Sequence, residues 1–116
     1  MNTNKALIEL CESFLEAKEP NWDGYNAEAI TESSFKGALR FLYLLPPKIP
    51  QPEISPDIGN SFCFDWHKDN NSFSVSVSES SVSYACKNLS GTKTFHNTIP
   101  EEVVQILSDL FLVKQR

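Results

Sequence analysis

Three side chains that could take part in chemistry alternate along one short segment, at Cys63, Asp65 and His67. Alternation by two places them on one face of a β-strand, with Asp65 and His67 roughly 6–7 Å apart. Cys63 would lie about 13 Å from His67 by the same strand rise, too far for a thiolate–imidazole pair. An enzyme or a small ligand-binding domain could use this face if His96 joined Asp65 and His67 in a pocket.

Spacing patterns that bind metals or cofactors are not found in this sequence. The chain has two histidines and lacks His-x-x-x-His, Glu-x-x-His and Cys-x-x-Cys. Its glycine turns at 59–60 and 90–92 have no phosphate-binding pattern around them. Three widely spaced cysteines, Cys11, Cys63 and Cys86, indicate reduced thiols and not a disulfide framework. We therefore expect no metal site and no cofactor.

The negative charge of the chain is concentrated at its N-terminal end. The net charge is −5, and residues 1–32 contain seven acids and two lysines, whereas residues 33–116 contain eight acids and eight bases. Direct nucleic-acid binding is not expected, because phosphate neutralisation needs a basic patch. A protein partner with a basic surface is the natural complement. Four glutamates recur at helical spacing, opposite the apolar positions Leu7, Leu10, Cys11 and Phe14: Glu9, Glu12, Glu16 and Glu19.

The pentapeptide Asn-Trp-Asp-Gly-Tyr at 21–25 contains an Asp-Gly turn and two large aromatic residues. We expect Trp22 and Tyr25 to fix this turn against the junction of helices and sheet, because aromatic side chains bury large areas. The alternative makes them exposed anchors of a binding surface, since both residue types are favoured at binding hot spots. The candidate partner-binding residues are Glu9, Glu12, Glu16, Glu19, Trp22, Asp23 and Tyr25.

Two helices and a proline-rich connector are expected before these chemically interesting strands. A first helix over about 4–17 and a second helix capped by Thr31 make up a helical part at 1–45. Gly37 within the second helix is expected to let another element approach closely. The segment 46–60 contains five prolines, so we expect neither a helix nor a central strand there. Its length indicates either a packed strap or a mobile loop.

Hydrophobic alternation with a period of two begins after the connector. Three strong segments and one weaker segment predict a four-stranded antiparallel meander within 61–97. Thr98 and Glu101 are spaced as a capping box for a C-terminal helix within 98–116. We therefore expect one domain, 1–116, with an α+β fold: two N-terminal helices, the four-stranded antiparallel meander, and a C-terminal helix packed on one sheet face.

Five short motifs are spread along the chain: Asn-Trp-Asp-Gly-Tyr at 21–25, a Leu-Pro-rich stretch at 44–56, Phe-Asp-Trp at 64–66, Phe-Ser-Val at 73–75 and Ile-Pro-Glu-Glu at 99–102. Together they resemble a family of small uncharacterised bacterial proteins. Members of that family share the aromatic turn after a first helix, a Pro-rich connector, and a C-terminal meander plus helix. The resemblance covers most of the chain and implies an antitoxin, immunity or anti-defence role within small paired or mobile gene sets.

The location and the function expected from the sequence follow from these observations. The longest apolar run, Phe41–Pro47, is too short to span a bilayer, and the first ten residues contain no secretory signal, so we expect a cytoplasmic protein without a membrane partner. We expect a non-enzymatic protein–protein interaction module that neutralises a partner through the acidic helix face or the sheet surface. The alternative is a small ligand-binding domain or enzyme that uses Asp65, His67 and His96. Homo-oligomerisation is compatible with both.

Overall fold

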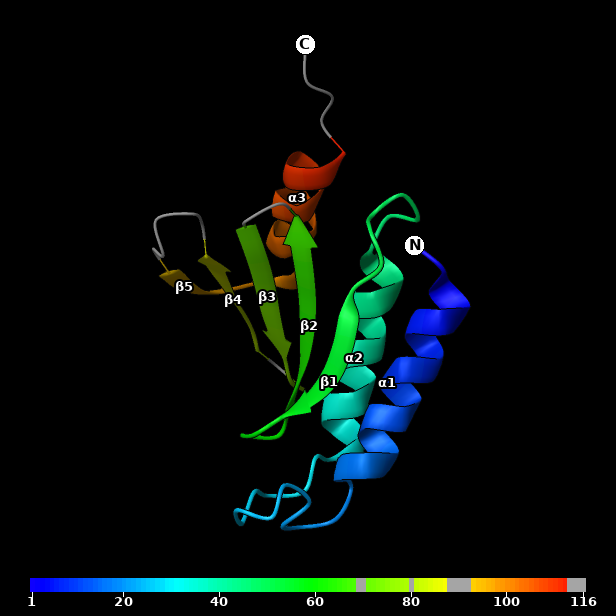
Figure 1. The fold of residues 1–116 in the computed structure, drawn as a ribbon, viewed down its shortest axis with the longest axis vertical. Helices are drawn as coiled ribbons and strands as arrows, with labels where there is room; N and C mark the ends of the chain where they lie inside the picture. Colours follow the sequence, from blue (N-terminus) through cyan, green and yellow to red (C-terminus); the bar gives the residue numbers. More distant parts are fainter. Residues whose placement is uncertain (69–70, 80, 88–92, 113–116) are drawn as a thin grey trace.

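Three helices and five antiparallel strands form an α+β fold (Figure 1). The structure is a computed structural model that describes residues 1–68, 71–79, 81–87 and 93–112, with the backbone alone at 71, 87 and 93–96. The elements in chain order are α1 (Thr3–Ala17), α2 (Glu32–Leu44), β1 (Glu53–Asp57), β2 (Ser61–Lys68), β3 (Asn71–Val77), β4 (Val82–Lys87), β5 (Lys93–Thr98) and α3 (Pro100–Phe111). The expected fold class is confirmed.

The sheet is a meander in which every strand pairs with its neighbours in sequence, in the order β1-β2-β3-β4-β5. Strand β1 is an addition to the expected four strands, because it lies within the segment expected to be only a connector. Ile54 pairs with Phe64, and Pro56 pairs with Phe62. Proline lacks the N–H of a central strand but is tolerated at an edge, which is where β1 lies.

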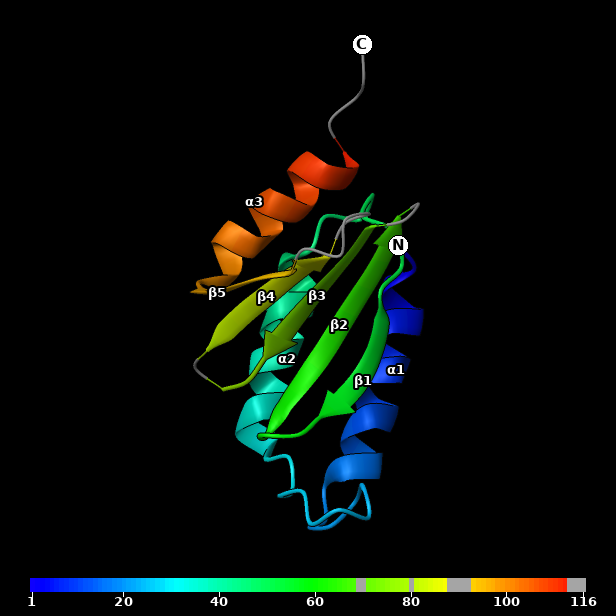
Figure 2. The ribbon, with the colours of Figure 1, turned by 60° about the vertical axis from the view of Figure 1, so that its left-hand side comes forward.

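One face of the sheet carries the hydrophobic core. Period-two alternation places Phe62, Phe64 and Trp66 on the same face of β2, and all three are buried. The Phe64 ring packs edge-on against Phe41 of α2, with ring centroids 5.1 Å apart. Helices α1 and α2 pack against the first strands and α3 contacts α2, so the helices lie on one side of the sheet (Figure 2). No other described element covers the opposite face, which we call the outer face.

The connector is a packed strap, one of its two expected forms. Trp66 Nε1 donates a hydrogen bond of 2.8 Å to the carbonyl oxygen of Pro50. Ile49 is fully buried, and Gln51 exchanges hydrogen bonds with the backbone of Asn2 at 2.7 and 3.2 Å. These contacts hold the start of α1 beside the start of β1.

Capping of α2 agrees with the sequence, whereas capping of α3 does not. The Thr31 side chain accepts a hydrogen bond from the Ser34 N–H at 3.2 Å. Helix α3 has Ile99 at its N-cap position and no side-chain cap, so the capping box expected from Thr98 and Glu101 is wrong. The reason is that Thr98 still pairs with β4, and its buried hydroxyl has no hydrogen-bond partner among the described residues.

Candidate partner-binding surface

The connection between α1 and α2, which we call the Tyr25 loop (residues 18–30), is held by its own polar side chains. Asp23 Oδ1 accepts hydrogen bonds from the backbone N–H groups of Tyr25 at 2.8 Å and Ala27 at 3.0 Å. Asn21 Oδ1 accepts one from the Asn26 N–H at 2.7 Å, and the Asn21 N–H donates to the Ala27 carbonyl at 2.7 Å. Asp and Asn side chains characteristically stabilise turns in this way.

Three left-handed residues set the course of the Tyr25 loop. Asn21 has φ 62°, Gly24 φ 79° and Asn26 φ 68°. Glycine adopts this region freely, and asparagine does so more easily than other side chains. A hydrogen bond of 2.9 Å from the Ile30 N–H to the Ala17 carbonyl closes the base of the loop. The loop is therefore compact and locally determined.

The two aromatic residues of the loop have different environments. Trp22 is half-buried against the core, and its Nε1 donates to the Glu28 carbonyl at 3.0 Å. Tyr25 is 89% exposed. The expectation that both would fix the turn is therefore confirmed for Trp22 and wrong for Tyr25. The physical reason is that Asp23 binds the backbone of residue 25 and so replaces a buried ring as the stabilising contact.

The acidic residues of α1 lie beside the sheet edge. Ser13 is buried, and its hydroxyl donates to the Ile54 carbonyl of β1 at 3.4 Å. Glu9 and Glu16 lie one turn before and after Ser13 on the same side of the helix, and Glu12 lies next to them. We call Glu9, Glu12 and Glu16, together with Glu19 just beyond the end of the helix, the acidic side of α1.

The orientation of α1 differs from the expected one, in which the glutamates lie opposite the buried side of the helix. The buried residues of α1 are Ala6, Leu10, Ser13 and Ala17. The centre of this buried side is rotated about the helix axis by roughly 80° from the centre of the expected apolar face. The position opposite the core is taken by Ile8 and Leu15, which are 58% and 62% exposed. The small side chains of alanine and serine allow close approach to β1, so they determine which side of α1 faces the sheet.

The acidic side of α1 forms no ion pair with the residues that the structure describes. Within the described residues, the ion pairs are Lys36–Glu32 at 3.5 Å and His67–Glu53 at 3.6 Å. Neither involves the acidic side of α1 or Asp23. Like charges at these helical spacings repel one another, so a basic partner would relieve a local electrostatic cost.

The exposed edge of β1 is protected against pairing with another strand. Pro56 has no N–H to donate, and the hydroxyl of Ser13 already binds the carbonyl of Ile54. A partner at this edge would therefore contact side chains and not extend the sheet.

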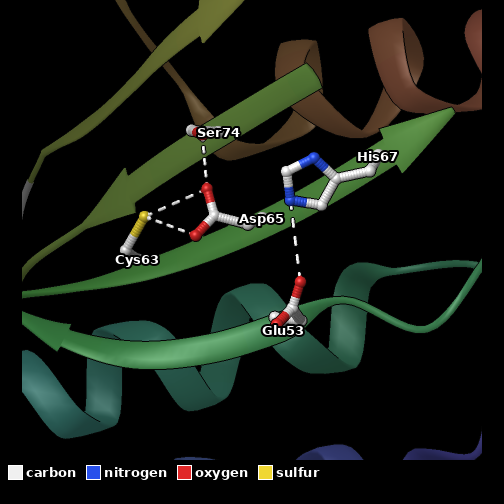
Figure 3. Close-up of polar contacts among 5 residues, drawn as sticks. All are labelled: Glu53, Cys63, Asp65, His67 and Ser74. Carbon is white, nitrogen blue, oxygen red and sulfur yellow. Dashed lines mark hydrogen bonds and ion pairs between the residues drawn. The ribbon is translucent and has the colours of Figure 1, made fainter. Parts of the chain in front are cut away.

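The outer face carries the residues that the sequence marked as a possible enzyme or ligand site (Figure 3). Asp65 accepts hydrogen bonds from the Ser74 hydroxyl and from the Cys63 thiol, whose sulfur lies 3.4 and 3.5 Å from its two oxygens. His67 Nε2 lies 3.6 Å from Glu53 Oε1 on β1. Asp65 and His67 therefore have separate partners, although they share a face as expected.

The Cys63 thiol is held in its protonated form. Burial, then the negative charge of Asp65 and the hydrogen bond to it, and then the charge of Asp57 raise the pKa of Cys63 from 9.0 to about 12. Burial also raises the pKa of Cys86. A thiol with such a pKa donates hydrogen bonds and is a poor source of thiolate nucleophile.

His96 is not brought next to Asp65 and His67. His96 lies on β5 and pairs with Tyr84 of β4, which in turn pairs with Val75 of β3. Asp65 lies on β2, three strands from β5, and pairs with Ser74, the residue before Val75. The side chain of His96 lies outside the described residues. Among the described side chains, no group of three or more His, Cys, Asp and Glu is placed to hold a metal ion.

No helix of the described chain has both the length and the apolar character needed to cross a membrane.

Comparisons with known proteins assign no family to the chain. Comparison of the chain with protein-family models, with curated proteins and with solved structures finds no match in any of the three.

Proposed function

We propose that this protein is a non-enzymatic interaction module that binds a second protein with a basic surface. The contact regions are the Tyr25 loop and the acidic side of α1, which are continuous because α1 leads directly into the loop. The observation that carries the proposal is the exposure of Tyr25, at 89%, on a loop whose backbone is already fixed by Asp23 and Asn21.

The Tyr25 loop has the physical properties of a binding anchor. Tyrosine is enriched at interface hot spots because it buries a large ring and keeps a polar tip. A loop that is already ordered loses little conformational entropy when it binds, so more of the contact energy appears as affinity. The exposed neighbours Glu19 and Glu28 are acidic, which favours a partner cleft that is apolar inside and basic at its rim.

The acidic side of α1 supplies the electrostatic part of the interaction. Glu12, Glu16 and Glu19 are exposed and Glu9 is half-exposed. Surface charges of this kind contribute mainly to the rate and specificity of association, and their effect falls as salt rises. We therefore expect complex formation to be faster and tighter at low ionic strength.

The resemblance to small bacterial proteins supports a more concrete version of the same function. In that version the module is an antitoxin, immunity or anti-defence protein of the bacterial cytoplasm, and its partner is the basic protein that it neutralises. Neither a membrane nor direct contact with nucleic acid is part of the proposal.

The test is affinity capture with matched baits. Tagged wild-type protein, Tyr25→Ala and the triple variant Glu9→Lys/Glu12→Lys/Glu16→Lys are exposed to a lysate of the source organism at 50 and 500 mM salt, and captured proteins are quantified by mass spectrometry. We expect one basic protein at near-stoichiometric yield with the wild type, lost at high salt and with both variants.

Two control variants test whether loss of capture is specific to the proposed surface. Tyr43→Ala removes a tyrosine that is also exposed, at 62%, but lies on α2. Glu101→Lys/Glu102→Lys places positive charge on exposed positions of α3. Both controls should capture the partner like the wild type. Capture of the partner at the wild-type level by Tyr25→Ala and by the α1 triple variant would refute the proposed surface.

A further inference from the structure

The centre of the outer face contains a shallow hollow of about 180 Å³. Backbone pairing aligns Cys63, Ser76 and Ser83 across β2, β3 and β4. Because these side chains are small, they leave open a space that larger residues would fill. The lining includes Asp57, Cys63, Ser74, Ser76, Ser83 and Ala85.

The polar groups around the hollow are fixed and acidic. Asp57 Oδ2 accepts a hydrogen bond from the Ser76 hydroxyl at 3.1 Å, and Asp57 Oδ1 accepts one from the Ile58 N–H at 2.9 Å. Asp65 lies next to the lining and accepts hydrogen bonds from the Cys63 thiol and the Ser74 hydroxyl. No Lys or Arg of the described residues forms an ion pair with Asp57 or Asp65.

The same negative charges act on the Cys63 thiol in the lining. The raised pKa of Cys63 has burial as its first cause, followed by the charge of Asp65, the hydrogen bond to it, and the charge of Asp57. Burial disfavours any charged group, but the negative charges of Asp65 and Asp57, which also disfavour the thiolate, favour a cation in the same place. The hollow therefore suits a positively charged group that can donate several hydrogen bonds.

We propose that the hollow is a subsite for the guanidinium group of an arginine side chain carried by the protein partner. Guanidinium is planar and presents five donors, which match the Asp57 carboxylate and the hydroxyl oxygens of Ser76 and Ser83. Its flat, weakly hydrated face suits the small side chain of Ala85, whereas a lysine ammonium is a compact and strongly hydrated charge. This subsite rests on the proposed function, because it assumes a basic partner.

The outer face and the acidic side of α1 can be reached by the same partner. Asp57 ends β1, and α1 packs along that strand. A partner that crosses the β1 edge would place one basic segment beside α1 and an arginine over the hollow. Its side chains would do so without extending the sheet, since Pro56 and Ser13 protect the edge.

The subsite can be tested on the free protein with N-acetyl-L-arginine N-methylamide as the probe. Backbone amide shifts in ¹⁵N-labelled protein are followed during titration, with the neutral isostere N-acetyl-L-citrulline N-methylamide as the matched control. We expect saturable shifts at Cys63, Ser76 and Ala85, with a dissociation constant on the order of 1–10 mM for so small a ligand. The citrulline probe should bind at least about tenfold more weakly, because it lacks the charge.

Two variants test the site by independent means. Asp57→Asn removes the lining charge and keeps an acceptor oxygen, and Ala85→Leu fills the hollow while keeping the charge. Each variant should lower the affinity for the arginine probe at least about tenfold, whereas Asp109→Asn on α3 should leave that affinity unchanged. Equal shifts with both probes, or shifts confined to α1, would overturn the subsite.

The subsite and the proposed function can fail separately. Absence of probe binding with normal capture of a basic partner would remove the subsite and leave the proposed function standing. Probe binding at the hollow without any partner would support a guanidinium site and count against the interaction module.

Discussion

The reactivity of Cys63 tests the geometry of the outer face directly. An ordinary thiol with a pKa of 9.0 is about 10% thiolate at pH 8, whereas a thiol with a pKa of about 12 is roughly 0.01% thiolate. The thiolate fraction is thus about 1,000-fold lower. A thiolate of higher pKa is intrinsically more nucleophilic by about 20-fold over three pKa units, for a Brønsted coefficient of 0.4–0.5. The expected net effect is disulfide exchange about 50-fold slower than that of a simple cysteine amide.

The assay uses a protein in which Cys63 is the single cysteine, through Cys11→Ser and Cys86→Ala. Exchange with a chromogenic disulfide is followed from pH 7 to 10.5, and the rate should rise throughout without a plateau. Asp65→Asn in this background removes the largest charge effect and should bring the plateau to lower pH, whereas Asp109→Asn should not. A plateau near pH 9 in the parent protein would refute the burial and the Asp65 contact inferred for Cys63.

Two further changes test the packing of α2 and the order of the Tyr25 loop. Gly37→Ala would place a Cβ atom 2.3 Å from the carbonyl oxygen of Ser78, so overpacking should exceed the roughly 1 kcal/mol gained in helix preference and lower the free energy of unfolding by about 1–2 kcal/mol. Urea denaturation measures this, and an equally stable variant would contradict the close approach. Asp23→Ala removes two hydrogen bonds to the loop backbone, so the amides of Tyr25 and Ala27 should exchange faster and stability should fall by about 1 kcal/mol. Unchanged hydrogen exchange at these amides would show that other contacts hold the loop.

Elements whose residues carry a local signal could be predicted from the sequence. Period-two alternation from Phe62 to Tyr84 identifies the strands that form the centre of the sheet, and Thr31 identifies the start of α2. Gly37 was expected to allow close approach, and the backbone at Ser78 is the element that approaches it. These features depend on neighbours in sequence or on one small side chain.

Features that depend on tertiary context could not be predicted from the sequence. Strand β1 contains Pro56 and is stable only because it lies at an edge beside α1. The contact of His67 with Glu53 could not be predicted without that strand. The rotation of α1 could not be predicted from its large apolar residues, because the small side chains of Ser13 and Ala17 are among those that α1 buries.

The exposure of Tyr25 had a signal that could have been used. Asn21, Gly24 and Asn26 are the residue types that most readily adopt positive φ, and their spacing predicts a loop that turns several times within a few residues. Asp23 between them supplies a local acceptor for the backbone. Asp23 and Asn21 bind the loop backbone, and Trp22 supplies the contact with the core.

The most direct test of the central claim is the affinity of the captured partner for Tyr25→Ala compared with Tyr43→Ala, measured by calorimetry with purified proteins. A hot-spot tyrosine contributes about 2 kcal/mol or more, so Tyr25→Ala should raise the dissociation constant at least about 30-fold. Tyr43→Ala should stay within about twofold of the wild type. Equal affinities for the two variants would contradict the claim that Tyr25 on its preformed loop anchors a protein partner.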